Sequence, residues 1–163
     1  MPEFTRRATR MLDEDHRASS ALLDALDRLF AATGRRAPAA ADPGPAELLR
    51  RTADAIEGEI ADHFAFEEEA LFPPLRAAGE DDLCDHLCAE HETLLPLGRK
   101  VVALARAGLA SGFDDAAWRR FRTAAGTLIE GLRAHIEKED RALLPLLEEL
   151  LTPEQDMALT GAR

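Results

Sequence analysis

An internal repeat constrains the fold of this chain more than any other feature. Residues 63–75 read HFAFEEEALFPPL and residues 135–147 read HIEKEDRALLPLL, so His-x-x-x-Glu occurs twice, 72 positions apart (135 − 63). Two further histidines follow the same plan, because His16 and His91 are 75 positions apart (91 − 16). Each half of the chain therefore has one segment with a single histidine and one with His-x-x-x-Glu. This pattern predicts a duplicated helical hairpin.

The segments that carry the repeat are expected to be helices. Four stretches rich in Ala, Leu, Glu and Arg have apolar residues at helical spacing. They cover roughly residues 5–31, 46–77, 82–106 and 114–150. They are connected by a long loop with prolines and glycines at residues 31–45 and by glycine-containing turns at residues 76–82 and 105–115. Aromatic residues make up only 5% of the chain, which argues against a sheet. We expect an all-α fold, an antiparallel four-helix bundle with up-down-up-down topology.

Length and charge limit the class of protein. A chain of 163 residues fits one domain, which we expect to span residues 1–163 with its core at about 10–150. The net charge of −11 argues against a nucleic-acid partner, since phosphate neutralisation needs a basic surface. No apolar run reaches the ~18 residues of a membrane span, and the N-terminal residues lack the apolar segment of a secretory signal. Cys84 and Cys88 are poorly placed for a disulfide, so we expect a cytoplasmic protein without membrane contact.

The repeated motif places metal-binding groups on one face of a helix. Positions i and i+4 lie about one turn apart, so both side chains of each His-x-x-x-Glu motif can contact one ion. With the two single histidines, the motifs supply four imidazoles and two carboxylates, and helical bundles build dinuclear sites in this way. This mixture favours iron, manganese or zinc over calcium or magnesium. The candidate metal ligands are His16, His63, Glu67, His91, His135 and Glu139.

All four candidate histidines lie on the apolar face of their own helix. Ile56 and Ile60 share the stripe of His63, and Leu132 shares the stripe of His135. Burying two carboxylates and four imidazoles without a partner would cost several kcal/mol per ion, as a rough scale. A bound metal removes this cost. A metal site is therefore favoured over a set of ordinary core histidines.

The acidic residues beside the candidate ligands are expected to be peripheral. Glu68 and Asp140 either accept hydrogen bonds from ligating imidazoles or lie on the surface. Asp15, Glu90 and Glu92 flank ligand histidines, and we expect them to point to solvent. The fifth histidine, His86, lies about 140° around the helix from His91 and is also expected on the surface.

Two prolines recur six residues after the motif glutamates. Because proline cannot continue the hydrogen-bond ladder of a helix, we expect Pro73 to end its helix and Pro145 to kink its helix. A short turn at residues 153–158 is expected to close the chain.

The combined pattern resembles a known family. His … His-x-x-x-Glu-Glu-x-x-Leu-Phe-Pro … Glu-His … His-x-x-x-Glu, from about residue 10 to 150, is similar to the hemerythrin-like (HHE cation-binding) domain. The resemblance implies a four-helix bundle with a non-haem di-iron centre and an oxo or hydroxo bridge. It also implies that Glu67 and Glu139 bridge the irons, that the histidines are terminal ligands, and that a position stays open for O₂ or another small ligand.

The chain departs from the respiratory members of this family at one ligand. Respiratory hemerythrins carry a fifth histidine in a His-x-x-x-His pair, and the places around His91 hold Leu87 and Leu95. A set of four histidines and two glutamates is similar to the iron-handling branch, and it predicts an extra open coordination position. Respiratory hemerythrins also use His-x-x-x-x-Asp in the last helix, so Asp140 is an alternative to Glu139, which the internal repeat favours.

These features favour a di-iron protein that binds or reacts with O₂, peroxide or NO, or that handles iron. Manganese or zinc could take the place of iron. No residue resembles a dedicated proton relay, so the sequence does not assign an enzyme activity or a protein partner. The alternatives are a metal- or oxygen-dependent sensor or interaction module and a structural, zinc-bound or metal-free bundle.

Overall fold

The structure is a computed structural model that describes residues 4–39 and 42–161. In these ranges every regular element is helical, so the all-α prediction is confirmed. The helices are α1 (Arg7–Thr33), α2 (Pro43–Ala55), α3 (Ala61–Phe66), α4 (Phe72–Ala77), α5 (Asp81–Ser111), α6 (Asp115–Lys138), α7 (Leu144–Leu150) and α8 (Pro153–Thr160). Three π-helical turns connect some of them: η1 (Ile56–Ile60), η2 (Glu67–Leu71) and η3 (Glu139–Leu143). Among the described helices, none has the length and apolar character that crossing a bilayer requires.

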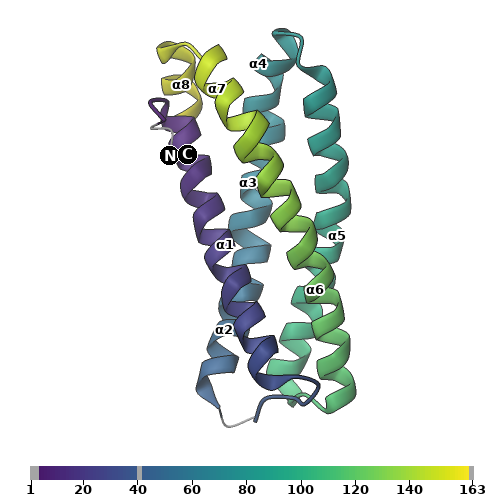
Figure 1. Cartoon of the computed structure of the whole chain (residues 1–163). Coiled ribbons are helices and arrows are strands. Elements are labelled where there is room, and N and C mark those ends of the chain that lie inside the picture. The colour runs from purple at the N-terminus through teal and green to yellow at the C-terminus, as the bar shows by residue number, and fades with distance from the viewer. Residues whose placement is uncertain (1–3, 40–41, 162–163) are drawn as a thin grey trace.

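The helices run along one long axis in alternating directions. The chain reverses direction between α1 and α2, between α4 and α5, and between α5 and α6 (Figure 1). The segments from α2 to α4 follow one another along a single path, as do those from α6 to α7 (Figure 1). Helix α5 packs against both α6 and α2, and α1 packs against α7 and α8. Residues far apart in sequence can therefore meet at one level of the molecule.

The connections are shorter than the glycine and proline content indicates. The predicted turn at 105–115 is too long, because α5 continues to Ser111 and includes the buried Gly108, and α6 begins at Asp115. A Cβ atom at Gly108 would lie 1.9 Å from Cζ of Phe113, so this glycine gives room to an aromatic ring. The helix ends only at Gly112, whose φ of 79° favours glycine. The predicted loop at 31–45 is also shorter, and its positions 40–41 lie outside the described residues.

The two repeated prolines lie just after π-helical turns. Pro73 does not end its helix, as the sequence predicted, because η2 precedes it and the chain continues as α4. Pro145 follows η3 in the same way and lies in the first turn of α7. A proline inside a helix lacks an N–H and collides with the carbonyl four residues earlier. The π-helical turns change the hydrogen-bond register at that point, so both segments remain helical.

Helix α8 fixes the start of α1. The expected short turn at 153–158 is a helix, and its N-cap Thr152 forms a capping box with Gln155. The buried Asp156 of α8 accepts hydrogen bonds from the backbone N–H groups of Arg7 and Ala8, each at 2.8 Å. These N–H groups belong to the first turn of α1, which has no cap from its own side chains. The two ends of the described chain are therefore held together.

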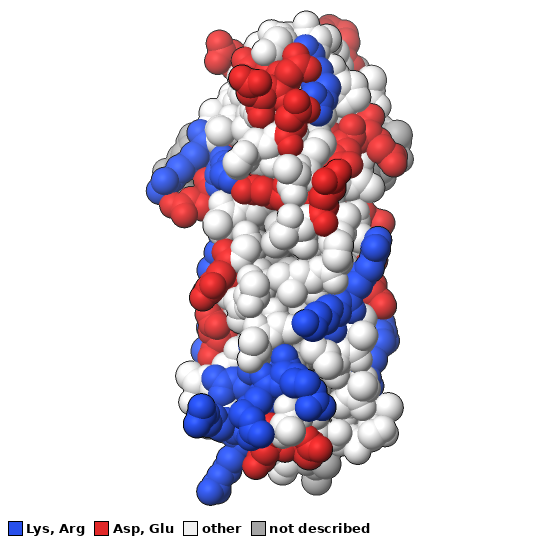
Figure 2. Space-filling view, turned by 90° about the vertical axis from the view of Figure 1, so that its right-hand side faces the viewer, with Lys and Arg blue, Asp and Glu red and all other residues white. Residues whose placement is uncertain are grey.

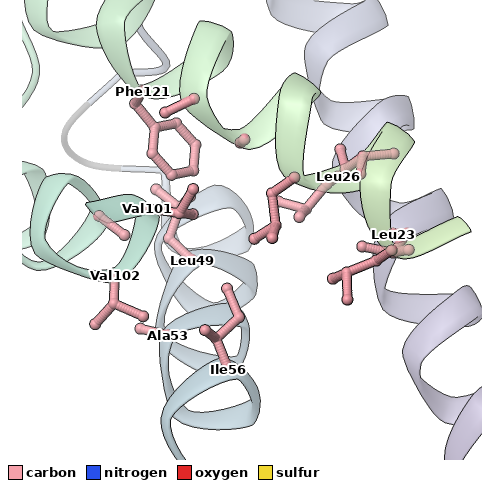
Figure 3. Packing of buried hydrophobic residues seen from close by; sticks show 14 of the residues in the cluster. Leu23, Leu26, Leu49, Ala53, Ile56, Val101, Val102 and Phe121 are labelled. Carbon is pink, nitrogen blue, oxygen red and sulfur yellow. The ribbon is translucent and has the colours of Figure 1, made fainter. Parts of the chain in front are cut away.

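The hydrophobic core consists of two clusters. One contains Leu23, Leu49 and Phe121 among others (Figure 3), and the other contains Leu12 and Leu147. The candidate histidines lie between them along the helices. In α1, for example, His16 follows Leu12 of one cluster and precedes Leu23 of the other. Polar groups at this level are thus enclosed by apolar packing above and below.

Candidate metal centre

All six candidate ligands are buried and lie together. His16 is in α1, His63 in α3, His91 in α5 and His135 in α6, and each is at most 6% exposed. The glutamates are fully buried and occupy the first positions of η2 and η3. Four helical segments that are distant in sequence thus contribute side chains to one site. The members of this cluster, called here the centre, are His16, His63, Glu67, His91, His135 and Glu139.

The centre divides into two groups that share both glutamates. The first group consists of two histidines and two glutamates: His16, His63, Glu67 and Glu139. The second group replaces the histidines: Glu67, His91, His135 and Glu139. In each group the ligand atoms lie within 4.8 Å of one another, which suits a single ion. The centre therefore has room for two cations with two carboxylates in common.

Each shared glutamate presents one oxygen to each group. Oε1 of Glu67 lies 3.3 Å from Nε2 of His63, and its Oε2 lies 3.3 Å from Nε2 of His91. Oε2 of Glu139 lies 3.0 Å from Nε2 of His16, and its Oε1 lies 3.0 Å from Nε2 of His135. A carboxylate with its two oxygens directed at different groups is arranged to bridge two ions. Both glutamates have this arrangement.

Every histidine of the centre forms a hydrogen bond with a carboxylate of another helical segment. These contacts all involve Nδ1. The pairs are His16 with Asp140 at 2.7 Å, His63 with Asp15 at 3.1 Å, His91 with Glu68 at 2.7 Å, and His135 with Glu90 at 2.8 Å. We call Asp15, Glu68, Glu90 and Asp140 the outer carboxylates. They fix the orientation of each ring and favour the tautomer whose Nδ1 carries the hydrogen.

The outer carboxylates follow the internal repeat. Asp15 and Glu90 each precede a histidine of the centre by one residue and are 75 positions apart (90 − 15). Glu68 and Asp140 each follow a glutamate of the centre by one residue and are 72 positions apart (140 − 68). The prediction that Asp15 and Glu90 point to solvent is therefore wrong. Each reaches across to the next helix, a contact that helical periodicity within one segment does not reveal.

The other acidic and basic neighbours differ in their roles. Lys138 contacts Glu90 through a short ion pair and lies 2.6 Å from Nε2 of His86, so Glu90 is held on two sides. Contacts to Lys138 and His135 lower the pKa of Glu90 despite its partial burial, which acts in the opposite direction. His86 is exposed, as expected, and so is Glu92. Asp140 lies outside the centre, against His16, whereas Glu139 lies inside it.

The polar atoms of the centre fit a cation. In the described part of the chain, the buried Nε2 of His16 and all four oxygens of Glu67 and Glu139 have no hydrogen-bond partner of good geometry. Because the Nδ1 atoms face carboxylates, the Nε2 lone pairs point into the centre. Buried acceptors that face one another are costly unless something positive lies between them. Imidazole nitrogen and carboxylate oxygen are suitable donors for a transition metal.

The pKa values of residues in the centre also indicate that it favours positive charge. Burial alone lowers the pKa of His16, but contacts with Asp140 and Glu139 outweigh it and raise the value to about 9. The pKa of His63 rises to about 11 because Asp15, Glu139 and Glu67 outweigh burial in the same way. Burial opposes ionisation of Glu139, but the surrounding imidazoles hold its pKa well below the usual range. Without a cation, protons on the imidazoles balance the buried carboxylates.

Aromatic rings enclose the second group. Phe64 stacks on His91 with ring centroids 3.8 Å apart and an angle of 12° between the planes. Phe72 lies on the same imidazole with centroids 6.2 Å apart. Both rings are nearly fully buried, so they exclude water from His91 and restrict its movement.

The helical fold and the buried cluster of imidazoles and carboxylates define a cation-binding protein of the all-α class. A comparison with protein families agrees: residues 7–147 match the hemerythrin HHE cation binding domain. The chain therefore belongs to this family, as the resemblance of its sequence motifs had indicated. No curated protein and no solved structure matches the chain.

Proposed function

We propose that the protein is a non-haem di-iron protein, with two iron ions held inside an antiparallel four-helix bundle. In this proposal its centre binds or reacts with O₂, peroxide or NO, or handles iron. The observation that carries the proposal is the pair of groups that share Glu67 and Glu139, with one oxygen of each glutamate directed at each group. Manganese or zinc would meet the same donors.

Each residue of the centre has a separate role in this proposal. His16 and His63 hold one ion, and His91 and His135 hold the other. Glu67 and Glu139, which belong to both groups, would be shared by the two ions. Bound iron would supply one-electron chemistry between its ferrous and ferric forms. The outer carboxylates hold the Nδ1 protons, so that Nε2 is free to bind metal.

Space for a small ligand lies beside the first group. A cavity of about 80 Å³ is lined by residues that include His16, His63, His135 and Glu139. This exceeds the ~30 Å³ that one water occupies in the liquid. Each group offers two imidazoles and two carboxylates, fewer than the six donors of octahedral iron, and the residues at the places of a fifth histidine are Leu87 and Leu95. Both features support binding of a small external ligand at the centre.

The test is metal content per chain after anaerobic loading with ferrous iron. We expect about two irons per chain by elemental analysis, and new near-ultraviolet absorption after exposure to air. One metal or none, with an unchanged spectrum, would contradict the di-iron proposal. Stable binding of two ions without any response to O₂, peroxide or NO would instead favour a metal-dependent structural or sensor role.

A further inference from the structure

A larger apolar cavity lies next to the centre. It has a volume of about 340 Å³ and lies where η1 and α3 face α5 and α6. Most of its lining is aliphatic or aromatic, and includes Ile56, Phe64, Leu95 and Leu128. A cavity of this size and character is typical of sites for small organic molecules.

The cavity extends toward the centre. Ile60, Phe64 and Leu132 line both this cavity and the smaller one beside the candidate ligands. Phe64 also stacks on His91. A molecule in the larger cavity would therefore touch residues that pack directly on the centre.

Two charged residues line the cavity, and only one of them has its charge satisfied. Glu57 forms an ion pair with Arg106, so its carboxylate is already neutralised. Arg99 is exposed, and within the described part of the chain no carboxylate lies within ion-pair distance of its guanidinium. The cavity thus combines an apolar interior with a cation at its exposed edge. Apolar molecules that end in an anionic group match this combination.

We propose that the cavity binds a monocarboxylate with an apolar chain, with the carboxylate on Arg99 and the chain among Ile60, Phe64 and Leu128. A guanidinium binds a carboxylate through two parallel hydrogen bonds, which gives the site its preference for an acid over a neutral or cationic analogue. The site is separate from the metal ligands. It does not require that the proposed di-iron chemistry is correct.

The first experiment measures binding of decanoate to the full chain by isothermal titration calorimetry. We expect decanoate to bind, with decanol and decylamine at least about ten-fold weaker. Arg99→Gln should weaken decanoate binding about ten-fold or more. The matched control is Lys100→Gln, which removes the same charge from the same helix. Lys100 lines a different groove, together with Arg119 and Arg120. On the face of the molecule that Figure 2 shows, Lys and Arg side chains gather toward the lower end.

A second pair of variants tests the cavity itself. Ala61 lines the cavity, whereas Ala65 lies one turn further along and is exposed. Ala61→Phe should abolish decanoate binding and Ala65→Phe should leave it unchanged, with circular dichroism confirming that both variants fold. The proposal is overturned if decanoate does not bind, if decylamine binds equally well, or if either variant pair behaves alike. Decanoate binding is measured on the protein as purified and again after chelation. An effect of metal removal is thereby distinguished from the absence of an acid site.

Discussion

The Nε2 atoms of His91 and His135 lie 3.2 Å apart in the interior of the protein. Both rings present Nδ1 to a carboxylate, Glu68 and Glu90 respectively, so in the neutral form both Nε2 atoms carry lone pairs. Two lone pairs at this distance repel each other unless a proton or a cation lies nearby. The centre is therefore stable only when it holds positive charge, and the following predictions depend on which kind it holds.

The stability of the metal-free protein should depend strongly on pH. The folded pKa of His16 is raised to about 9 and that of His63 to about 11, from an ordinary value of 6.5. A raised folded pKa contributes stability that is fully present below the unfolded value and is lost as pH rises through the folded value. We expect the Tm of the metal-free protein to fall between about pH 7 and pH 11. The metal-loaded protein should change much less, because metal replaces the protons. Parallel Tm curves for the two forms would contradict this.

Single histidine variants should remove one metal site at a time. His63 belongs only to the first group and His91 only to the second, whereas Glu139 belongs to both. We expect His63→Ala and His91→Ala to retain about one ion per chain each, and Glu139→Ala to retain fewer. His86→Ala is the matched control, because His86 lies on the same helix as His91 but is exposed, and it should retain about two ions. Elemental analysis decides, and an equal loss from all four variants would refute the two-group arrangement.

Removal of an outer carboxylate should weaken metal binding without changing its stoichiometry. Glu68→Gln and Asp140→Asn replace the charged acceptor of the Nδ1 hydrogen of His91 and His16 with a neutral amide. Loss of such a partner typically costs roughly 10–100-fold in metal affinity. Glu92→Gln should have no effect, because Glu92 is exposed next to His91 on the same helix. Competition titrations with a chelator measure the affinity. If Asp140→Asn removed a whole ion per chain, Asp140 would be a ligand itself.

Two helical glycines should respond in opposite ways to alanine. A Cβ at Gly108 would lie within 2.4 Å of three ring atoms of Phe113, so Gly108→Ala should destabilise the protein by about 1–3 kcal/mol. Gly126 in α6 has open space at that position, so Gly126→Ala should stabilise it by about 0.5–1 kcal/mol. Urea unfolding of both variants measures the two changes. A loss of stability in both would show that the spacing around Phe113 is not the cause.

The two His-x-x-x-Glu pairs of the centre were predictable because the geometry of each pair is local to one helical segment. His63 and Glu67 lie on one helix, so the helical period alone places them together, and the repeat gives their counterparts His135 and Glu139. Of the outer carboxylates, Glu68 and Asp140 were already candidate acceptors for ligating imidazoles. Asp15 and Glu90 were not predicted in this role, because they act across helix boundaries. A signal was present nonetheless: their spacing of 75 positions equals that of His16 and His91, to which they are adjacent.

The ends of the helices were also only partly predictable from the sequence. Gly108 was interpreted as part of a turn because glycine is common in turns. In the structure it allows a close approach between α5 and Phe113, which depends on the path of the chain after the helix. Likewise, Pro73 predicted a helix end, and the π-helical turn that accommodates it cannot be read from residue preference alone.

The outer carboxylates also determine how the interior communicates with solvent. The side chains of Asp140 and Glu68 are 47% and 42% exposed, yet each is one hydrogen bond from an almost completely enclosed imidazole. A change in the charge of the centre is therefore felt at the molecular surface across a single contact. No helix has to separate from its neighbours for ions in the surrounding medium to screen or reinforce that charge. Burial separates these imidazoles from the surface of the protein but not from the electrostatic conditions outside.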